Sequence, residues 1–191
     1  MNYRIFELLN SSAGRWPVVD DLIRFSAVYL VFLVFSIGGG VVVHTLVQRR
    51  IRPVVSLASA LALAFGLSQI LTHASHEQRP FQSHPVHQLI AHSPGVGMPS
   101  DHATAAFAIA FGVMVFLSRR AGLALTVLAV LIGVARVWCG IHYPGDILAG
   151  AVIAALGVLT AYVVGRGPRA VIPDSASLQD SPVTLARRDP R

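Results

Sequence analysis

The sequence predicts an all-α integral membrane protein, a helical bundle of about five transmembrane helices with an amphipathic interfacial helix at the N-terminus. The first observation is the composition: 54% of the 191 residues are hydrophobic and 13% are charged, whereas an ordinary soluble domain carries about 25% charged residues. The second is that the charges cluster and leave five long uncharged stretches. This composition excludes a disordered chain, a coiled coil and most soluble single domains.

Residues 1–22 are predicted to form a short amphipathic helix on the outer membrane interface. Apolar side chains such as Ile5 and Phe6 are mixed with Arg4, Glu7 and Arg15, a combination typical of helices that lie in the interface plane. A cleaved signal peptide does not fit, because the segment is acidic as well as basic and the apolar run after it is long enough to span a membrane.

The five uncharged stretches are the predicted spanning helices: residues 25–43, 53–72, 103–118, 121–135 and 147–165. Crossing about 30 Å of hydrocarbon takes about 20 helical residues, and three stretches meet that length. The third and fourth have 16 and 15 residues and reach only about 24 Å at the helical rise. Their polar ends, Ser100-Asp101-His102 and Arg136, must therefore lie at membrane depth, where polar groups are costly and usually functional.

Arginines mark the predicted cytoplasmic side. All 15 basic residues are Arg, and with nine acidic residues the net charge is +6. With five spans, three groups fall on one side: Arg49, Arg50 and Arg52; Arg119 and Arg120; Arg166 and Arg169. The positive-inside rule makes that side the cytoplasm, and seven of the eight His residues lie on the other side. We interpret the excess charge as topology and lipid headgroup contact, not as a nucleic-acid site.

The C-terminal residues 166–191 differ in composition from the rest of the chain. Residues 166–191 are rich in Pro, Ser, Asp and Arg and are predicted to be a disordered cytoplasmic tail, which leaves residues 1–165 as the membrane-embedded domain. The single cysteine, Cys139, excludes a disulfide framework. The sequence indicates no oligomeric state.

Three polar clusters share the predicted outer face: Glu77-Gln78-Arg79-Pro80, Pro99-Ser100-Asp101-His102, and Arg136 with His142 and Asp146. Two Arg side chains can grip a phosphate with paired donors. Ser100 is placed as an N-cap, so the first N–H groups of the following helix form an anion site. Taken singly, each cluster has a plainer interpretation, an interfacial Arg anchor or a simple helix cap.

The two histidines of these clusters suit acid–base and nucleophilic chemistry. One His near a phosphate can attack it while the other donates a proton. His142 and Asp146 are four residues apart across a Tyr-Pro-Gly turn in which Pro144 can start a helix. Asp146 could then accept a hydrogen bond from one ring nitrogen and leave the other as a free nucleophile.

These spacings resemble a known family. Arg79-Pro80, Pro99-Ser100-x-His102 and Arg136-x5-His142-x3-Asp146 resemble the three signature motifs of the type 2 phosphatidic acid phosphatases, the PAP2 superfamily, which are membrane relatives of vanadium haloperoxidases and bacterial acid phosphatases. Asn2-Tyr3-x-Ile5-Phe6 and Gly140-x-His142-Tyr143-Pro144-x-Asp146 further resemble the bacitracin-resistance (BcrC-like) type of undecaprenyl-diphosphatase. The likeness covers most of residues 1–165.

Two positions depart from the wider family. Its first motif begins with Lys seven residues before the Arg, where this chain has Thr72, and its third-motif Arg follows Ser, where this chain has Ala135. The bacitracin-resistance type also lacks that Lys and carries an acid two residues before the Arg, which Glu77 matches. Without the Lys, Arg79 and Arg136 must bind more of the phosphate charge.

The resemblance implies a role for each motif residue. His142 attacks phosphorus and forms a phosphohistidine, Asp146 orients it, and His102 protonates the leaving oxygen and then activates water. Arg79, Arg136 and the Ser100 backbone hold the phosphate oxygens, where fixed donors stabilise the transition state. The accessory positions are Glu77, Asp101, Thr72, Pro80 and Gly140. No metal and no other cofactor is implied.

The implied function is hydrolysis of undecaprenyl (polyprenyl) diphosphate to the monophosphate, which recycles the cell-wall carrier lipid at the outer face of a bacterial inner membrane. The alternatives are a phosphatase for phosphatidylglycerophosphate or phosphatidic acid, a lipid phosphotransferase and, least favoured, a non-enzymatic lipid-binding protein. Five histidines crowd residues 73–92, and His-x-x-His spacing can bind zinc. We favour a solvated loop over the site that touches headgroup or diphosphate at low pH.

Overall fold

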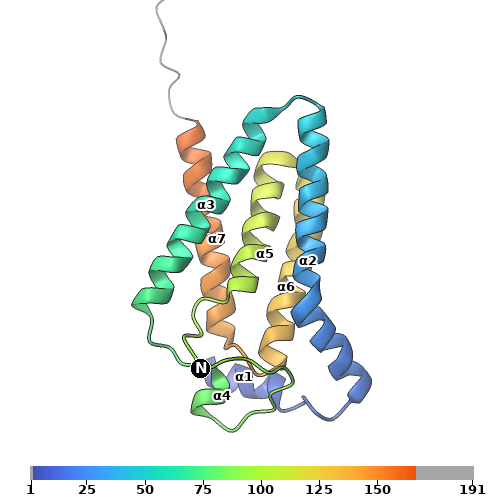
Figure 1. The fold of residues 1–191 in the computed structure, drawn as a ribbon, viewed down its shortest axis with the longest axis vertical. Helices are drawn as coiled ribbons and strands as arrows, with labels where there is room; N and C mark the ends of the chain where they lie inside the picture. The colour runs from blue at the N-terminus through green and yellow to red at the C-terminus, as the bar shows by residue number, and fades with distance from the viewer. Residues whose placement is uncertain (1, 167–191) are drawn as a thin grey trace, which may run out of the picture.

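The structure, a computed structural model, describes residues 2–166. Its helices are α1 (Asn2–Asn10), α2 (Pro17–Val47), α3 (Ile51–Ala74), α4 (Pro80–Ser83), α5 (Asp101–Gly112), the π-helical turn η1 (Val113–Leu117), α6 (Arg119–Trp138) and α7 (Pro144–Gly165). The long helices run up and down the bundle, while α1 and α4 lie at its lower end (Figure 1). The prediction of an all-α bundle is confirmed. The predicted tail lies outside the described residues, apart from Arg166.

Four helices, α2, α3, α6 and α7, are long and apolar enough to cross a membrane. The shorter helix formed by α5 and η1, Asp101–Leu117, lies between them, as predicted for the third stretch. The fourth stretch is longer than predicted, since α6 has 20 residues. Its helix continues through Arg119 and Arg120 at one end and Arg136 at the other, so the prediction that it is one of two short spans is wrong.

The N-terminal boundary also differs from the prediction. The separate N-terminal helix is α1 alone, and α2 begins at Pro17, well inside the predicted interfacial segment 1–22. Proline suits the first turn of a helix because its φ is already helical and its missing N–H needs no partner. Asp20, Asp21 and Arg24 therefore belong to the first turns of α2, a 31-residue helix that is about 46 Å long.

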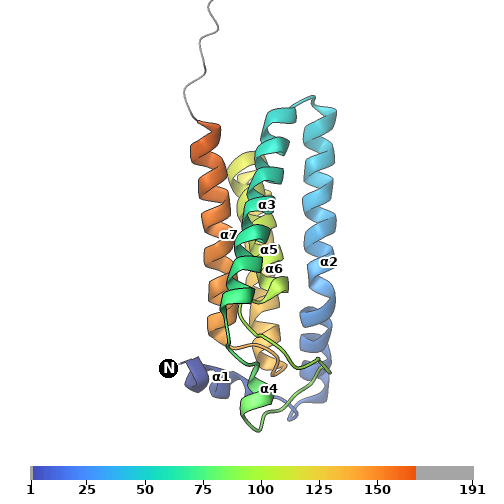
Figure 2. The same cartoon turned by 60° about the vertical axis from the view of Figure 1, so that its left-hand side comes forward.

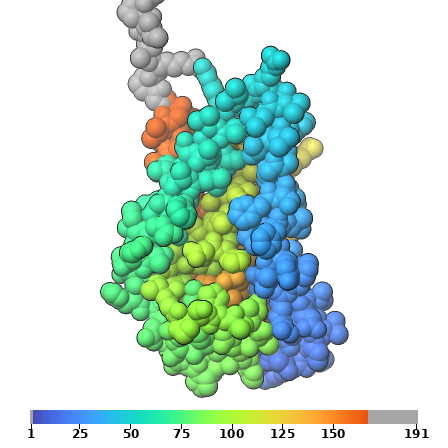
Figure 3. All heavy atoms as spheres, in the orientation of Figure 1, coloured from blue at the N-terminus to red at the C-terminus, as the bar shows by residue number. Residues whose placement is uncertain are grey.

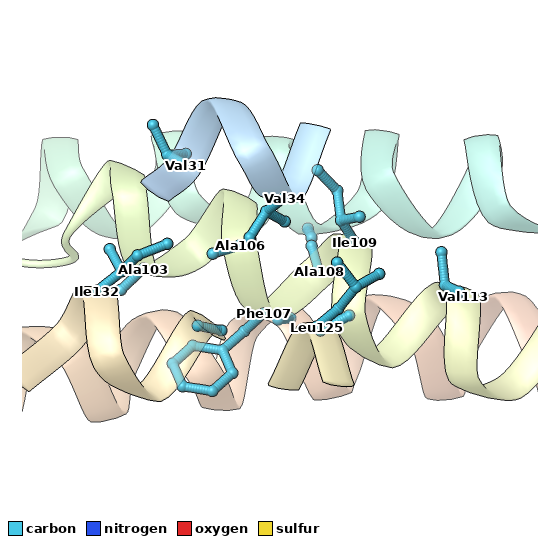
Figure 4. Close-up of a cluster of buried hydrophobic side chains, with 14 of the residues drawn as sticks. Val31, Val34, Ala103, Ala106, Phe107, Ala108, Ile109, Val113, Leu125 and Ile132 are labelled. Atoms are coloured by element: carbon cyan, nitrogen blue, oxygen red, sulfur yellow. The ribbon is translucent and has the colours of Figure 1, made fainter. Parts of the chain in front are cut away.

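The core is built around α5, whose small residues let its neighbours approach closely. Figure 4 shows Ala106 of α5 beside Val34 of α2, and Ala103 of α5 beside Ile132 of α6; all four residues are buried. On α7, a Cβ added at Gly150 would lie 2.8 Å from Thr104 Oγ1. Small residues at such contacts are the usual means of helix packing within membranes.

A groove opens between α2 and α3. The two helices are joined by a short turn at one end and diverge toward the other, so that α5 is visible between them (Figures 1 and 3). At this place the structure has a cavity of about 360 Å³. It is lined by apolar side chains of all three helices, including Phe35, Phe65 and Ile109, with Asp101 and Thr104 at the start of α5.

The longer non-helical segments lie at the lower end of the bundle in Figures 1 and 2, together with α1 and α4. The long connection between α3 and α5 is pinned by a bridge between Gln78 and Val96 and by the Gly97 N–H, which donates to the Glu77 carbonyl at 2.8 Å. The turn between α6 and α7 lies at the same end. The three predicted polar clusters therefore share one end of the molecule.

Candidate active site

The site is centred on His142, in the turn between α6 and α7. Its Nδ1 lies 3.2 Å from Asp146 Oδ2, and the Tyr143 N–H donates to the same oxygen at 2.9 Å. Pro144 starts α7, which places Asp146 in the first turn of that helix and facing back toward the histidine. Both side chains are buried, with His142 1% and Asp146 0% exposed. The carboxylate fixes the hydrogen on Nδ1, so Nε2 carries the lone pair.

Two guanidinium groups face Nε2. Arg79 Nη1 lies 3.1 Å from it and Arg136 Nη2 lies 3.4 Å from it. Backbone carbonyls hold the two side chains, because Arg79 donates to Ile141 O at 3.3 Å and Arg136 to Ala27 O at 3.2 Å. Two cations and one carboxylate leave this centre positively charged, which suits an anionic group at Nε2.

Several buried polar atoms at this centre have no hydrogen-bond partner within the described part of the chain: Arg79 Nε, Arg136 Nε, Ser100 Oγ and Asp146 Oδ1. A buried donor without a partner is costly in a folded protein unless it has a functional reason. The unpartnered guanidinium N–H groups and the serine hydroxyl fit the oxygens of a phosphate.

Ser100 occupies the N-cap position of α5, as predicted, and is fully buried. Its side chain makes no capping hydrogen bond, so the interpretation as a simple helix cap does not hold. Its backbone N–H donates to the Asp146 carbonyl at 3.2 Å, which joins the start of α5 to the start of α7. His102 follows in the first turn of α5, half-buried, and the charges of Arg136 and His142 lie within electrostatic range of its ring.

Burial sets the protonation of the groups in this turn. It lowers the pKa of His142 to about 4, against the opposing effect of the Asp146 hydrogen bond. The imidazole is therefore neutral at neutral pH, which leaves the Nε2 lone pair available for a nucleophilic role. Burial also lowers the pKa of Arg79, while the charges of Asp146 and Asp101 oppose the shift. Burial raises the pKa of the neighbouring Cys139 thiol to about 11, which keeps it protonated and poorly nucleophilic at neutral pH.

The accessory positions lie around this centre. Gly140 has φ +79°, and a Cβ there would lie 2.8 Å from the His87 carbonyl, so the turn requires glycine. Pro80 is buried and starts α4. Glu77 and Asp101 are exposed, and Thr72 donates to the Ser68 carbonyl of its own helix at 3.0 Å. The structure thus gathers the predicted principal residues and leaves these last three at the edge.

The sequence reasoning missed a second layer of polar contacts. Asp20 is 6% exposed and accepts hydrogen bonds from the Gly14 N–H and the Trp138 indole, both at 3.0 Å. These contacts attach the start of α2 to the end of α6, two residues beyond Arg136. The sequence holds one sign of this contact, which is the position of Trp138 two residues after the predicted phosphate ligand Arg136. Its partner Asp20 could not be identified because it lies in the segment predicted to be interfacial.

The His-rich segment forms part of the scaffold. His84 packs against Tyr3 with ring centroids 4.2 Å apart and planes tilted by 37°, and the backbone of His87 is hydrogen-bonded to Asn10. Within residues 2–166, no group of three or more His, Cys, Asp or Glu side chains is arranged to hold a metal ion.

Apolar spanning helices and a buried imidazole between two guanidiniums define a class of protein, a multi-pass membrane enzyme that acts on phosphate groups. The PAP2 superfamily model matches residues 53–168. The chain belongs to the PAP2 superfamily and is a membrane phosphatase, which confirms the resemblance found in the motifs.

Individual relatives cover most of the chain. Undecaprenyl-diphosphatase BcrC of Bacillus subtilis (strain 168) is 31% identical over 156 residues, 82% of this chain and 80% of that protein. Putative undecaprenyl-diphosphatase YbjG of Escherichia coli (strain K12) is 29% identical over 164 residues, 86% and 82% of the two proteins. The crystal structure of Aquifex aeolicus LpxE superposes with a TM-score of 0.69 at 25% identity, covering 85% of this chain and 94% of that one.

Proposed function

We propose that this phosphatase hydrolyses undecaprenyl diphosphate, or a similar polyprenyl diphosphate, to the monophosphate and inorganic phosphate. The observation that carries the proposal is the neutral Nε2 of His142 facing Arg79 and Arg136 at 3.1 and 3.4 Å. The similarity to BcrC of Bacillus subtilis over 82% of the chain supports the choice of substrate.

In the first step, Nε2 of His142 attacks the terminal phosphorus. The P–N bond forms as the bond to the bridging oxygen breaks, and His102 donates a proton to the departing lipid monophosphate. The imidazole becomes a cation as it is phosphorylated, and Asp146 stabilises that charge through Nδ1. Arg79 and Arg136 bind the equatorial oxygens, where the charge of the pentacoordinate state is concentrated.

In the second step, water attacks the phosphohistidine. His102, neutral after the first step, accepts a proton from the water, and the P–N bond breaks with both of its electrons returning to Nε2. Inorganic phosphate leaves and the enzyme regains its initial protonation.

The groove between α2 and α3 supports a lipid substrate. Its lining reaches Asp101 and Thr104 in the first turn of α5, the turn that also carries His102. An isoprenoid chain in this groove stays in the bilayer while its diphosphate reaches the site. Burial of apolar surface along such a chain contributes about 25 cal/mol per Å².

The proposed setting is a bacterial inner membrane with the site on the periplasmic side and the C-terminus in the cytoplasm. The antiparallel helices place Arg49, Arg119 and Arg166 at the end of the bundle away from the site, and the positive-inside rule assigns that end to the cytoplasm. Release of the monophosphate there would recycle the carrier lipid of cell-wall synthesis, and an abundant enzyme of this kind would counteract bacitracin.

The test is phosphate release by purified protein in detergent, from C55 diphosphate beside phosphatidic acid and phosphatidylglycerophosphate. We expect C55 diphosphate to have the highest kcat/KM and His142→Ala to lower its kcat by at least about 10⁴-fold, because the nucleophile is lost. His44→Ala, at the opposite end of the bundle, is the matched control and should retain wild-type activity. A His142→Ala protein that still turns over would contradict the mechanism, and a preference for another lipid would change the substrate.

A further inference from the structure

Helix α1 lies across the ends of the two helices that flank His142. Figures 1 and 2 show it beneath the lower end of the bundle, where α6 ends and α7 begins. Asn2, Phe6 and Asn10 are spaced by four residues and therefore lie on one face of α1. Phe6 and Asn10 are buried, at 1% and 3% exposed. This face makes a specific contact on each side of the turn that carries the nucleophile.

Asn2 caps α7 from outside that helix. Its Oδ1 accepts a hydrogen bond from the Gly145 N–H at 2.9 Å. Gly145 is the second residue of α7, and its N–H is one of the four donors that a helix N-terminus leaves without a partner. A Cβ on Gly145 would lie 2.9 Å from Asn2 Nδ2, so a larger residue there would push the Asn2 side chain away from this position. The next residue of the helix is Asp146.

Asn10 caps α6 in the complementary way. Its Nδ2 donates to the carbonyl of Trp138, the last residue of α6, at 2.8 Å and to the His87 carbonyl at 2.9 Å. Its Oδ1 accepts from the His87 N–H at 3.0 Å. The last four carbonyls of a helix lack partners, so Asn10 satisfies one of them and also fixes the loop that packs against Gly140.

Phe6 lies between these two caps. Its ring meets the ring of Tyr143 edge-on, with centroids 5.4 Å apart and planes at 69°. Tyr143 is the residue that follows His142, and its N–H donates to Asp146. α6 and α7 make few direct contacts with each other because α5 packs against both. The position of Arg136 on α6 relative to Asp146 on α7 therefore depends on the turn between the two helices and on the contacts that α1 makes with it.

We infer that α1 is a positioning element of the active site, with Asn2 and Asn10 as positioning residues that cap α7 and α6 and so hold His142 between Asp146 and Arg136. The inference rests on the proposed function for its kinetic consequence. Misplacing a reacting group by about 1 Å can lower a rate by about a hundredfold, and a loosened turn would displace Nε2 from the phosphorus without removing any group that binds substrate.

The two asparagines can be told apart chemically. Asn2 contributes only an acceptor, so Asn2→Asp keeps its hydrogen bond and Asn2→Ala loses it. Asn10 contributes a donor to two carbonyls, so Asn10→Asp, like Asn10→Ala, loses both of those bonds. Arg4→Ala, on the exposed face of α1, is the matched control. The five proteins are compared with wild type in neutral detergent after each is shown to be folded by its thermal unfolding transition.

We expect kcat for the polyprenyl diphosphate to fall by about ten- to a hundredfold in Asn2→Ala, Asn10→Ala and Asn10→Asp, with KM within about twofold of wild type. Asn2→Asp and Arg4→Ala should keep wild-type kcat. A role in folding alone would also lower the apparent kcat at unchanged KM, because less of the protein would be active. The kcat values are therefore expressed per folded protein, and the His142 titration separates positioning from folding.

A second readout does not depend on the substrate. Histidine-labelled protein is titrated by NMR, with the His142 signal assigned from the His142→Ala spectrum. In wild type, burial holds the pKa of His142 near 4. In Asn10→Ala the loosened turn admits water and the pKa should move toward the ordinary value of about 6.5, whereas Arg4→Ala should leave it unchanged. The charged groups that face the ring, Asp146, Arg79 and Arg136, are the same in all variants.

Wild-type kcat and an unchanged His142 titration in a folded Asn10→Ala protein would overturn the inference. Equal losses in Asn2→Asp and Asn2→Ala would overturn the capping of α7. If Asn10→Ala does not fold, the Asn2 pair decides by the same two readouts. If wild type releases no phosphate from the polyprenyl diphosphate, the proposed function fails, and the titration alone still decides whether α1 positions His142.

Discussion

His142 is a neutral imidazole held next to two cations and one anion. The charges have different tasks during phosphoryl transfer. In the proposed mechanism, Asp146 on Nδ1 stabilises the positive charge that the ring acquires on phosphorylation, and the two arginines that face Nε2 bind the incoming phosphate. An imidazole with an ordinary pKa would be partly protonated in mildly acidic surroundings and could not then act as a nucleophile. Burial lowers the pKa of His142 and so keeps the ring neutral there.

The depressed pKa of His142 predicts a pH dependence of stability. The unfolded chain takes up a proton at this residue near pH 6.5, but the folded protein does so only near pH 4. The free energy of unfolding should therefore decrease as the pH falls from about 6.5 to about 4, by up to about 3 kcal/mol. The thermal unfolding midpoint of wild type should drop more between pH 7 and pH 5 than that of His142→Gln. Equal drops would contradict the buried neutral ring.

At the scale of helices and turns, the contacts that the sequence reveals are the short-range ones. Ser100 could be predicted as the N-cap of its helix and Asp146 as the partner of His142, because each of these placements depends on residues close in the chain. The predicted topology and the family resemblance brought the two clusters to one site. Asn10 escaped prediction because its partners lie 77 and 128 residues away. The predicted start of α2 is wrong because the first turns of this helix carry charged residues. In the sequence, a charged stretch of this kind cannot be distinguished from a loop.

The contact between α7 and α3 gives a stability prediction at the same scale. A Cβ on Gly157 would lie 2.8 Å from the Ala60 carbonyl oxygen and 2.9 Å from the Ala64 nitrogen. Backbone atoms cannot rotate away, so Gly157→Ala should destabilise the protein by about 1–3 kcal/mol. Gly66→Ala is the control, because nothing lies within 4 Å of its added methyl. The two unfolding midpoints in detergent give the comparison, and a Gly157→Ala protein as stable as the control would refute the close packing.

At the scale of the whole molecule, charge is divided between the two ends. The Arg pairs of the short turns lie at one end, and the site with most of the histidines lies at the other. The sequence predicted this division because five spans alternate in direction, even though one of the five, α5 with η1, falls short of the length that a spanning helix ordinarily needs. It could not predict the divergence of α2 and α3, which depends on how side chains from three helices pack.

The topology can be tested by labelling with a membrane-impermeant maleimide in bacterial spheroplasts. Cys139 is fully buried, so the wild-type background should be low. Ser93→Cys, on the exposed connection near the site, should react in intact spheroplasts, whereas Arg50→Cys should react only after lysis. The reverse pattern would place the site in the cytoplasm.

The side opening between α2 and α3 has a consequence for kinetics. If substrate enters from the bilayer, the enzyme meets it by diffusion in two dimensions, and the relevant concentration is the mole fraction of substrate among the surrounding lipids. Adding inert lipid at constant total substrate would then slow turnover, and adding buffer would not. Rates measured in micelles and in vesicles would be comparable only when expressed per lipid surface.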